Sequence, residues 1–146
     1  MTENIHATCV ELNGYGVLIT GASGSGKSDL ALRLIENKKA ILVSDDRTDI
    51  AIKNGILTAS CPKNIEGLLE VRGIGLIQMP FKREASVKLI VEASLPSEID
   101  RLPDASFETI EGCRIPSLKL DLLTPSAPDK VVVKLKTLLE EYKERS

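Results

Sequence analysis

Residues 21–28 carry the segment that most constrains how this chain can fold. They read Gly21, Ala22, Ser23, Gly24, Ser25, Gly26, Lys27 and Ser28, the G-x-x-x-x-G-K-[ST] pattern of a phosphate-binding loop, or P-loop. Glycines let such a loop turn its N–H groups toward phosphate oxygens, while the lysine reaches the β- and γ-phosphates and the serine hydroxyl binds Mg²⁺. The eight residues are therefore predicted to bind the phosphates of a nucleotide, with Ser28 as a metal ligand.

The sequence on either side supplies the context that this pattern requires. The apolar run Tyr15–Thr20 predicts a buried strand before the loop, and apolar residues at helical spacing over 27–36 predict a helix after it. Bound phosphate would then lie at a helix N-terminus, where backbone N–H groups favour anions. A glycine- and serine-rich turn that binds nothing is the alternative, and the complete strand–loop–helix context disfavours it.

Composition limits the other classes of function. The 146 residues are expected to form a single domain, 1–146. The net charge is −2, and its 19 basic and 21 acidic residues are spread along the chain, which disfavours nucleic-acid and membrane partners. The sequence contains no transmembrane-length apolar run and no signal-peptide pattern. Cys9, Cys61 and Cys113 form no C-x-x-C pair, so a zinc site lacks support and a reducing cytoplasm is the expected location.

Local hairpins indicate the fold class. Residues 6–12 predict a strand that Asn13-Gly14 turns into the P-loop strand, and Asn54-Gly55 predicts a second hairpin within 50–59. Further strands are predicted at 40–43, 87–93, 107–115 and 118–122, and a C-terminal helix from Ser126 with Val131, Leu135, Leu138 and Tyr142 on one face. Strands thus outnumber helices. The predicted fold class is α/β, a P-loop-containing mixed sheet with few helices.

Two adjacent acids follow the apolar strand at 40–43. Asp45 and Asp46 lie at its carboxyl end, where open α/β sheets bind ligands and where P-loop enzymes place a metal-holding aspartate. Side chains of neighbouring extended residues point to opposite sides, so one carboxylate is expected to face the phosphates. A pair of surface acids that opens a loop is the alternative.

Three further observations leave alternatives open. Glu70 is a direct or indirect metal ligand, or an exposed partner of Arg72. His6 is the only histidine, and the residues alone do not decide between a structural and a catalytic role. Gly73 and Gly75 predict a bend or a close backbone approach within the apolar stretch 68–77. The guanine-specificity motif Asn-Lys-x-Asp is missing at 37–40, which argues against a Ras-type GTPase.

Four segments together resemble the catalytic domain of HPr kinase/phosphorylase. They are His6 followed by 14–21, the P-loop residues 22–28, Ser44-Asp45-Asp46-Arg47, and the stretch 69–77, which reads Leu-Glu-Val-Arg-Gly-Ile-Gly-Leu-Ile. Their order and approximate spacing agree over roughly the first 80 residues. The last segment is the most diagnostic, because ordinary P-loop kinases have nothing like it.

The resemblance implies an activity and a set of roles. Members of this family use ATP and Mg²⁺ to phosphorylate a serine of HPr, a small carrier protein of the sugar phosphotransferase system, and can remove that phosphate with inorganic phosphate. By resemblance, Asp46 is the base that takes the serine proton, Lys27 stabilises the transferring phosphoryl group, Ser28 and Glu70 hold Mg²⁺, and His6 is a functional histidine near the site. The family fold is a P-loop variant akin to phosphoenolpyruvate carboxykinase, and its members are typically hexamers.

The sequence departs from the family pattern at both ends. Family members usually carry an additional N-terminal domain, so this chain resembles the short form found in some proteobacteria. They also carry a Pro-Gly-Arg-Asn stretch linked to dephosphorylation, whereas no arginine lies between Arg114 and Arg145 here, which leaves Lys119 or a neighbouring subunit to stabilise charge. The leading hypothesis is an HPr-type serine kinase. The alternatives are a small-molecule P-loop kinase and a nucleotide-binding regulatory protein without transfer activity.

Overall fold

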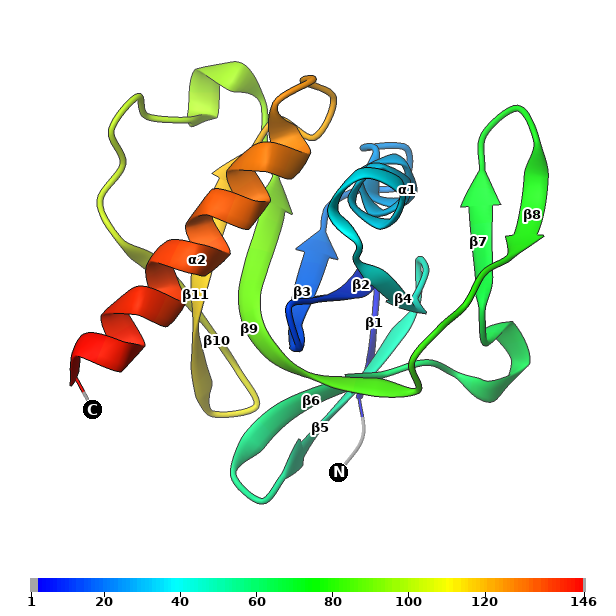
Figure 1. Cartoon of the computed structure of the whole chain (residues 1–146), viewed down its shortest axis with the longest axis horizontal. Coiled ribbons are helices and arrows are strands. Elements are labelled where there is room, and N and C mark those ends of the chain that lie inside the picture. The colour runs from blue at the N-terminus through cyan, green and yellow to red at the C-terminus, as the bar shows by residue number, and fades with distance from the viewer. Residues whose placement is uncertain (1–2, 146) are drawn as a thin grey trace.

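One large curled sheet organises the molecule, and both helices pack against the same face of it (Figure 1). The computed structural model describes residues 3–145, with the backbone alone at 141–145. The elements in chain order are β1 (Glu3–Ile5), β2 (Ala7–Leu12), β3 (Tyr15–Thr20), α1 (Lys27–Lys38), β4 (Ile41–Ser44), β5 (Thr48–Lys53), β6 (Ile56–Ser60), β7 (Leu68–Val71), β8 (Gly75–Gln78), β9 (Glu84–Ala93), β10 (Ser106–Ile110), β11 (Cys113–Leu120) and α2 (Ala127–Arg145). Single 3₁₀ turns lie at Lys63–Ile65 and Pro96–Glu98.

Strand β9 joins the two parts of the sheet. The strand order is β1-β5-β6-β9-β3-β2-β4, and β9 also pairs with β11, which pairs with β10. The first residues of β9 pair antiparallel with β6, and the later ones pair in parallel with β3 and β11. Figure 1 shows β9 as a long curved strand, and this curvature makes the sheet curl.

Four strands end at the same edge of the sheet. β9 and β11 run parallel to β3, and β4 does too because both β3 and β4 are antiparallel to β2. The P-loop therefore follows β3 at the edge where Asp45 and Asp46 follow β4. Ligands of open α/β sheets bind at this carboxyl edge.

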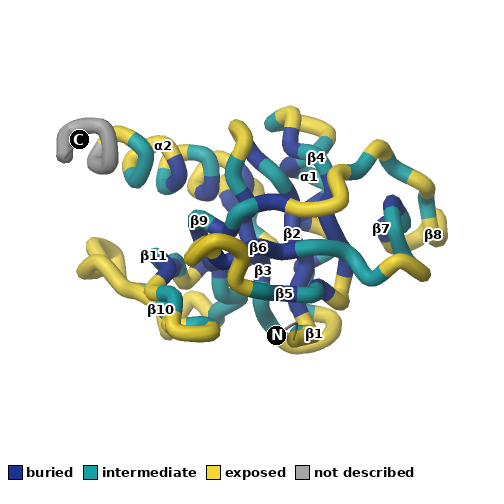
Figure 2. Tube along the Cα trace, turned by 90° about the horizontal axis from the view of Figure 1, so that it is seen from below, coloured by how far each residue is buried: buried dark blue, intermediate teal, exposed yellow. Residues whose placement is uncertain are grey.

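Alternating side chains give the sheet two apolar faces. Val17 and Ile19 of β3 pack toward Leu34 of α1, whereas Leu18 packs on the opposite face with Ile50. On the helical face, α2 contributes Val131 and Leu135, which are fully buried. Figure 2 shows the buried positions gathered in the central strands, with the exposed ones at the loops.

Most of the elements predicted from sequence are present. The P-loop strand spans the predicted residues, the following helix continues two residues further to Lys38, and both Asn-Gly turns join antiparallel strands. The predicted mixed sheet with few helices is confirmed. The strand predicted at 107–115 is wrong, because Glu111 and Gly112 form a hairpin turn with φ values of 49° and 80° and divide it into β10 and the start of β11.

The β7–β8 hairpin stands apart from the large sheet and flanks α1 (Figure 1). Gly73 lies in its turn and Gly75 is the first residue of β8. Both have positive φ, and nothing lies within 4 Å of where a Cβ would be at either residue. The glycines therefore make the bend and not a close approach. The side chain of Tyr142, predicted on the face of the last helix, lies outside the described residues. Within 3–145, no helix is long and apolar enough to cross a membrane.

Candidate active site

The P-loop lysine is folded back against its own loop. Lys27 is buried, and its Nζ donates hydrogen bonds to the carbonyl oxygens of Gly21 (2.9 Å) and Ala22 (3.1 Å). An ammonium group has three donors, so these two contacts leave one for a phosphate oxygen. The contacts hold the positive charge beside the N-terminus of α1, where helix geometry already favours an anion.

Two glycines are required by their neighbours or by their backbone conformation. A Cβ at Gly21 would lie 2.7 Å from both the Ala93 Cβ and the Ser25 Oγ, and one at Gly26 would lie 2.9 Å from the Leu123 Cδ2. Both residues also have positive φ, 154° and 100°. At Gly21 a side chain is therefore excluded by space as well as by backbone conformation. At Gly26 the backbone conformation is the main restriction, because the exposed Leu123 side chain can move aside.

The hydroxyl of Ser25 is a buried donor in the loop that has no hydrogen-bond partner among the described residues. A buried polar atom without a partner is costly, and phosphate oxygens are strong acceptors. The cradle therefore contains a donor that a bound phosphate would satisfy.

Asp45 connects the loop to two other elements. Its Oδ1 accepts hydrogen bonds from the hydroxyls of Ser28 (2.6 Å) and Thr8 (2.9 Å), and its Oδ2 accepts one from the backbone N–H of Glu70 (3.0 Å). The carboxylate is buried, and these three donors fix its orientation. A hydroxyl and a carboxylate in direct contact at a phosphate site are the oxygen ligands that Mg²⁺ uses together with substrate phosphates. Ser28 and Asp45 therefore fit a magnesium site.

Asp46 differs from its neighbour. It is exposed, has a left-handed φ of 65°, and donates its backbone N–H to Thr8 Oγ1 at 3.1 Å. Aspartate tolerates this conformation better than most residues, and such strained positions gather at functional sites. The Thr8 hydroxyl thus holds both acids, one buried against the P-loop and one facing solvent.

Glu70 reaches this cluster through its backbone. Its N–H bonds to Asp45, whereas its side chain is exposed. Among the described residues, no ion pair joins Glu70 to Arg72, so the surface pair considered from sequence is not formed. Within residues 3–145, no group of three or more His, Cys, Asp or Glu side chains could hold a metal ion by itself. A metal here would need ligands from the nucleotide.

His6 lies at the same edge of the sheet. It is exposed and occupies the bend between Ile5, which pairs with Thr48, and Ala7, which pairs with Thr20. Thr20 immediately precedes the P-loop, and Thr48 follows the Asp45–Asp46 turn by two residues. The fold therefore brings His6 near the predicted site without giving it a side-chain partner among the described residues.

The sequence prediction missed Arg33 and the loop that it holds. Arg33 of α1 donates to the carbonyl oxygens of Leu122 and, at 2.9 Å, Thr124, and it pairs with Asp29 at 3.0 Å. The loop is thereby fixed to α1, and Leu123 lies against Gly26 at the end of the P-loop. The Leu123 side chain is 70% exposed. The sequence carries no signal for this contact, because the exposure of Leu123 and its place beside Gly26 are visible only in the structure.

Comparison with known proteins agrees with this geometry. The family model described as "HPr Serine kinase C-terminal domain" matches residues 1–135. The chain belongs to this family. It is 38% identical over 113 residues to the HPr kinase/phosphorylase of Bordetella pertussis (strain Tohama I), covering 70% of this chain and 36% of that protein. It is 48% identical over 75 residues to the same-named protein of Clostridium botulinum (strain Eklund 17B), covering 51% of this chain and 24% of that protein.

A solved structure resembles this fold over almost the whole chain. The structure titled "Structure of the Hpr(Ser) kinase/phosphatase from Coxiella burnetii" matches with a TM-score of 0.79 and 27% identity, covering 98% of this chain and 92% of that one. The fold predicted from the resemblance is thereby confirmed. The chain spans about a third of the length of the Bordetella relative and about a quarter of the Clostridium one.

Proposed function

We propose that this chain transfers the γ-phosphoryl group of ATP to a serine of an HPr-like phosphocarrier protein. Membership of the family gives the reaction class, and its curated relatives are named for this activity. The observation that carries the proposal is the contact of the P-loop Ser28 with Asp45, next to an exposed acid, Asp46. A phosphate cradle, a metal-binding pair and a candidate base thus lie together.

The P-loop residues would bind the nucleotide. Backbone N–H groups of 21–28 and the Ser25 hydroxyl would donate hydrogen bonds to the β- and γ-phosphates, and Lys27 keeps a donor for the transferred group. Ser28 and Asp45 would hold Mg²⁺, and Glu70 lies one backbone hydrogen bond away. The bound ion supplies electrostatic stabilisation of the charge that develops on the phosphate oxygens.

Asp46 would accept the proton of the acceptor serine. The serine oxygen forms a bond to the γ-phosphorus, the bond from that phosphorus to the leaving ADP oxygen breaks, and the hydroxyl proton passes to the Asp46 carboxylate. An exposed carboxylate can meet a protein substrate arriving from solvent, whereas buried Asp45 cannot. In the reverse direction, an oxygen of inorganic phosphate forms a bond to the phosphorus of phosphoserine and the bond from that phosphorus to the serine oxygen breaks. Protonated Asp46 returns the proton to the serine oxygen, and the products are serine and pyrophosphate.

The decisive experiment mixes the purified chain with Mg-ATP and HPr and measures phosphoserine by mass spectrometry. Asp46→Asn is expected to lower transfer by at least about 100-fold, because it removes the base, and to leave ATP binding intact. Asp49→Asn is the matched control, since Asp49 accepts a hydrogen bond from exposed Asn4 and lies outside the site. Undiminished phosphorylation by Asp46→Asn would overturn the role proposed for this residue.

The same assay distinguishes this kinase activity from the two alternative functions. ATP binding without transfer to any acceptor would make the protein a nucleotide-binding regulator, and transfer to a small molecule would make it a small-molecule kinase. Phosphoserine loss on addition of inorganic phosphate measures the reverse reaction, for which residues 115–144 supply no arginine.

We also propose that residues 1–146 form one catalytic domain of a cytoplasmic homo-oligomer, a hexamer as in the family that it resembles. A partner chain could then supply the arginine that residues 115–144 lack. Light scattering coupled to size-exclusion chromatography measures the mass, and a monomer at assay concentration would contradict the hexamer.

A further inference from the structure

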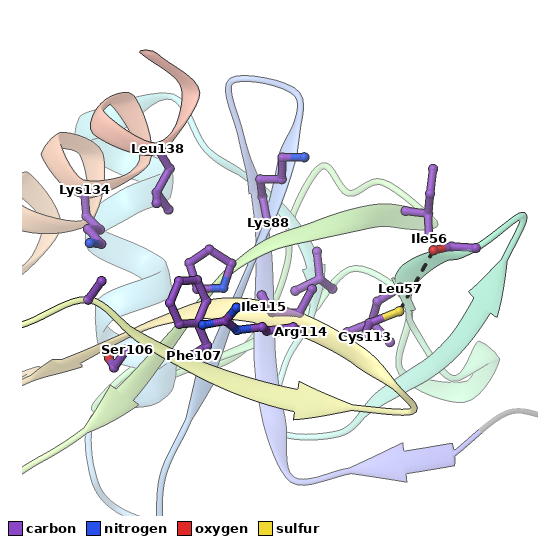
Figure 3. A pocket seen from close by; sticks show the side chains of 14 residues that line it. Ile56, Leu57, Lys88, Ser106, Phe107, Cys113, Arg114, Ile115, Lys134 and Leu138 are labelled. Carbon is purple, nitrogen blue, oxygen red and sulfur yellow. Dashed lines mark hydrogen bonds between the residues drawn. The ribbon is translucent and has the colours of Figure 1, made fainter. Parts of the chain in front are cut away.

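One hollow of the molecule lies away from the P-loop. It is a cavity of about 750 Å³ between the β5–β6 turn, β9, the β10–β11 hairpin and α2 (Figure 3). No P-loop residue, and none of Asp45, Asp46 and Glu70, lines it. Its volume falls within the range of small-molecule sites in proteins. The proposed kinase reaction therefore leaves it without a role.

The cavity carries positive charge only. Lys88, Arg114 and Lys134 line it from three different elements, and no aspartate or glutamate does. Lys88 already lies over the Tyr15 ring, 5.5 Å from its centroid, so Arg114 and Lys134 are the cations assigned to a ligand. Within the part of the chain that the structure describes, neither Arg114 nor Lys134 has an ion pair with a carboxylate.

Arg114 is held in a position suited to an anion. Its guanidinium carbon lies 3.8 Å from the centroid of the Phe107 ring, and Figure 3 shows the guanidinium against that ring. Stacking fixes the plane of the guanidinium and leaves its edge, which carries the N–H donors, for a carboxylate. Lys134 extends from α2 toward the same hollow.

The remaining walls are apolar. Ile56 and Phe107, which are 53% and 43% exposed, border the cavity together with Leu57, Ile115 and Leu138. Large apolar side chains in solvent gain free energy when a ligand covers them. Inorganic phosphate would pair with the cations but leave the apolar side chains exposed to water. A neutral hydrocarbon would cover the apolar side chains but leave the cations without an anion.

The geometry points to a binding site for a small organic carboxylate with a flat apolar body. The carboxylate lies between Arg114 and Lys134, and the body lies against Phe107 and Leu138. This site is separate from the nucleotide site and does not depend on the kinase proposal.

The test titrates the whole chain with 2-naphthoate and, in parallel, with its neutral isostere 2-naphthamide and with inorganic phosphate. Saturable amide shifts in ¹H–¹⁵N spectra are expected for 2-naphthoate, at residues of the β10–β11 hairpin and with a Kd of about 1 mM or below. 2-Naphthamide and phosphate are expected to bind at least about fivefold more weakly. Equal binding of the amide or of phosphate would overturn the proposal, as would the absence of saturation by 2-naphthoate.

Substitutions locate the site. Arg114→Gln and Lys134→Gln are each expected to weaken 2-naphthoate binding at least about fivefold. Lys136 lies on the same helix, exposed and outside the cavity, so Lys136→Gln is the matched control. If Lys136→Gln weakens binding as much as Lys134→Gln, general electrostatic attraction explains the result and the proposal fails.

A labelling experiment needs no substitution. Cys113 lines the cavity, whereas Cys61 does not. 2-Naphthoate is therefore expected to slow alkylation of Cys113 by iodoacetamide at least about threefold and to leave the rate at Cys61 unchanged. Equal protection of both thiols, or of neither, contradicts a ligand in this cavity.

Discussion

The hydroxyl of Ser28 donates a 2.6 Å hydrogen bond to Oδ1 of Asp45, which joins the P-loop to the end of β4. The same carboxylate accepts a hydrogen bond from the backbone of Glu70 in the β7–β8 hairpin. One buried side chain therefore contacts the loop that would bind phosphate and the hairpin that stands apart from the sheet. An ion that enters between Ser28 and Asp45 replaces their hydrogen bond and leaves Oδ2 of Asp45 available to the Glu70 N–H.

Asp45→Asn tests this arrangement. The amide keeps the size of the side chain but removes its negative charge, so Mg²⁺-dependent ATP affinity is expected to fall by about 10- to 100-fold. Calorimetric titration of ATP with Mg²⁺ and with EDTA measures the two affinities. Asp49→Asn should change neither. If Asp45→Asn lowers the affinity equally in EDTA, the residue supports the loop and does not serve the metal.

Leu123→Ser tests where the nucleobase lies. Because Leu123 contacts Gly26 at the end of the phosphate loop and is largely exposed, we expect the base of ATP to cover it. Loss of this apolar contact should weaken ATP binding by about three- to tenfold. Binding of tripolyphosphate, which has phosphates but no base, should stay the same. Leu102→Ser, at an exposed leucine in the loop between β9 and β10, is the control. An equal loss for both ligands would contradict a base contact.

Arg33→Met tests the connection between α1 and the loop before α2. The substitution leaves the carbonyl oxygens of Leu122 and Thr124 without their charged donor, which is expected to lower the free energy of unfolding by about 1–3 kcal/mol. Urea unfolding followed by circular dichroism measures this change. Arg83→Met should cost less than about 0.5 kcal/mol, because Arg83 is exposed and its contact with Glu66 is 3.9 Å long. Similar losses for the two variants would show that the Arg33 contacts add nothing.

Local patterns predicted the elements that local forces determine. The P-loop strand follows from an unbroken apolar run, and the helix after it follows from apolar spacing, so both lie where the sequence places them. Asn13 and Asn54 adopt positive φ in the two Asn-Gly turns, as the hairpin geometry requires. The hairpin at Glu111-Gly112 was missed because its first residue is not a typical turn former, although it too has positive φ.

Contacts between distant residues could not be predicted in the same way. Thr8 meets Asp45 across 37 positions, and Arg33 meets Leu122 across 89. Thr8 is one polar residue in a mainly apolar strand, and Arg33 is a basic residue on an amphipathic helix, so neither pattern indicates a partner. Their roles depend on how the sheet curls and on where the loop after β11 lies.

Glu108→Gln tests the pH dependence of stability. Partial burial, together with the nearby carboxylate of Glu92, raises the pKa of Glu108. A carboxyl whose pKa is higher in the folded state than in the unfolded state binds protons more tightly when the protein is folded. Its contribution to stability therefore falls as the pH rises from the unfolded-state pKa through the folded-state pKa. The glutamine variant has no such group. It is therefore expected to gain stability relative to the wild type between pH 4 and pH 7, as urea unfolding at the two values measures. Glu36→Gln, at an exposed position on α1, should show no such gain. A constant difference between Glu108→Gln and the wild type across this interval would mean that Glu108 does not titrate differently in the two states.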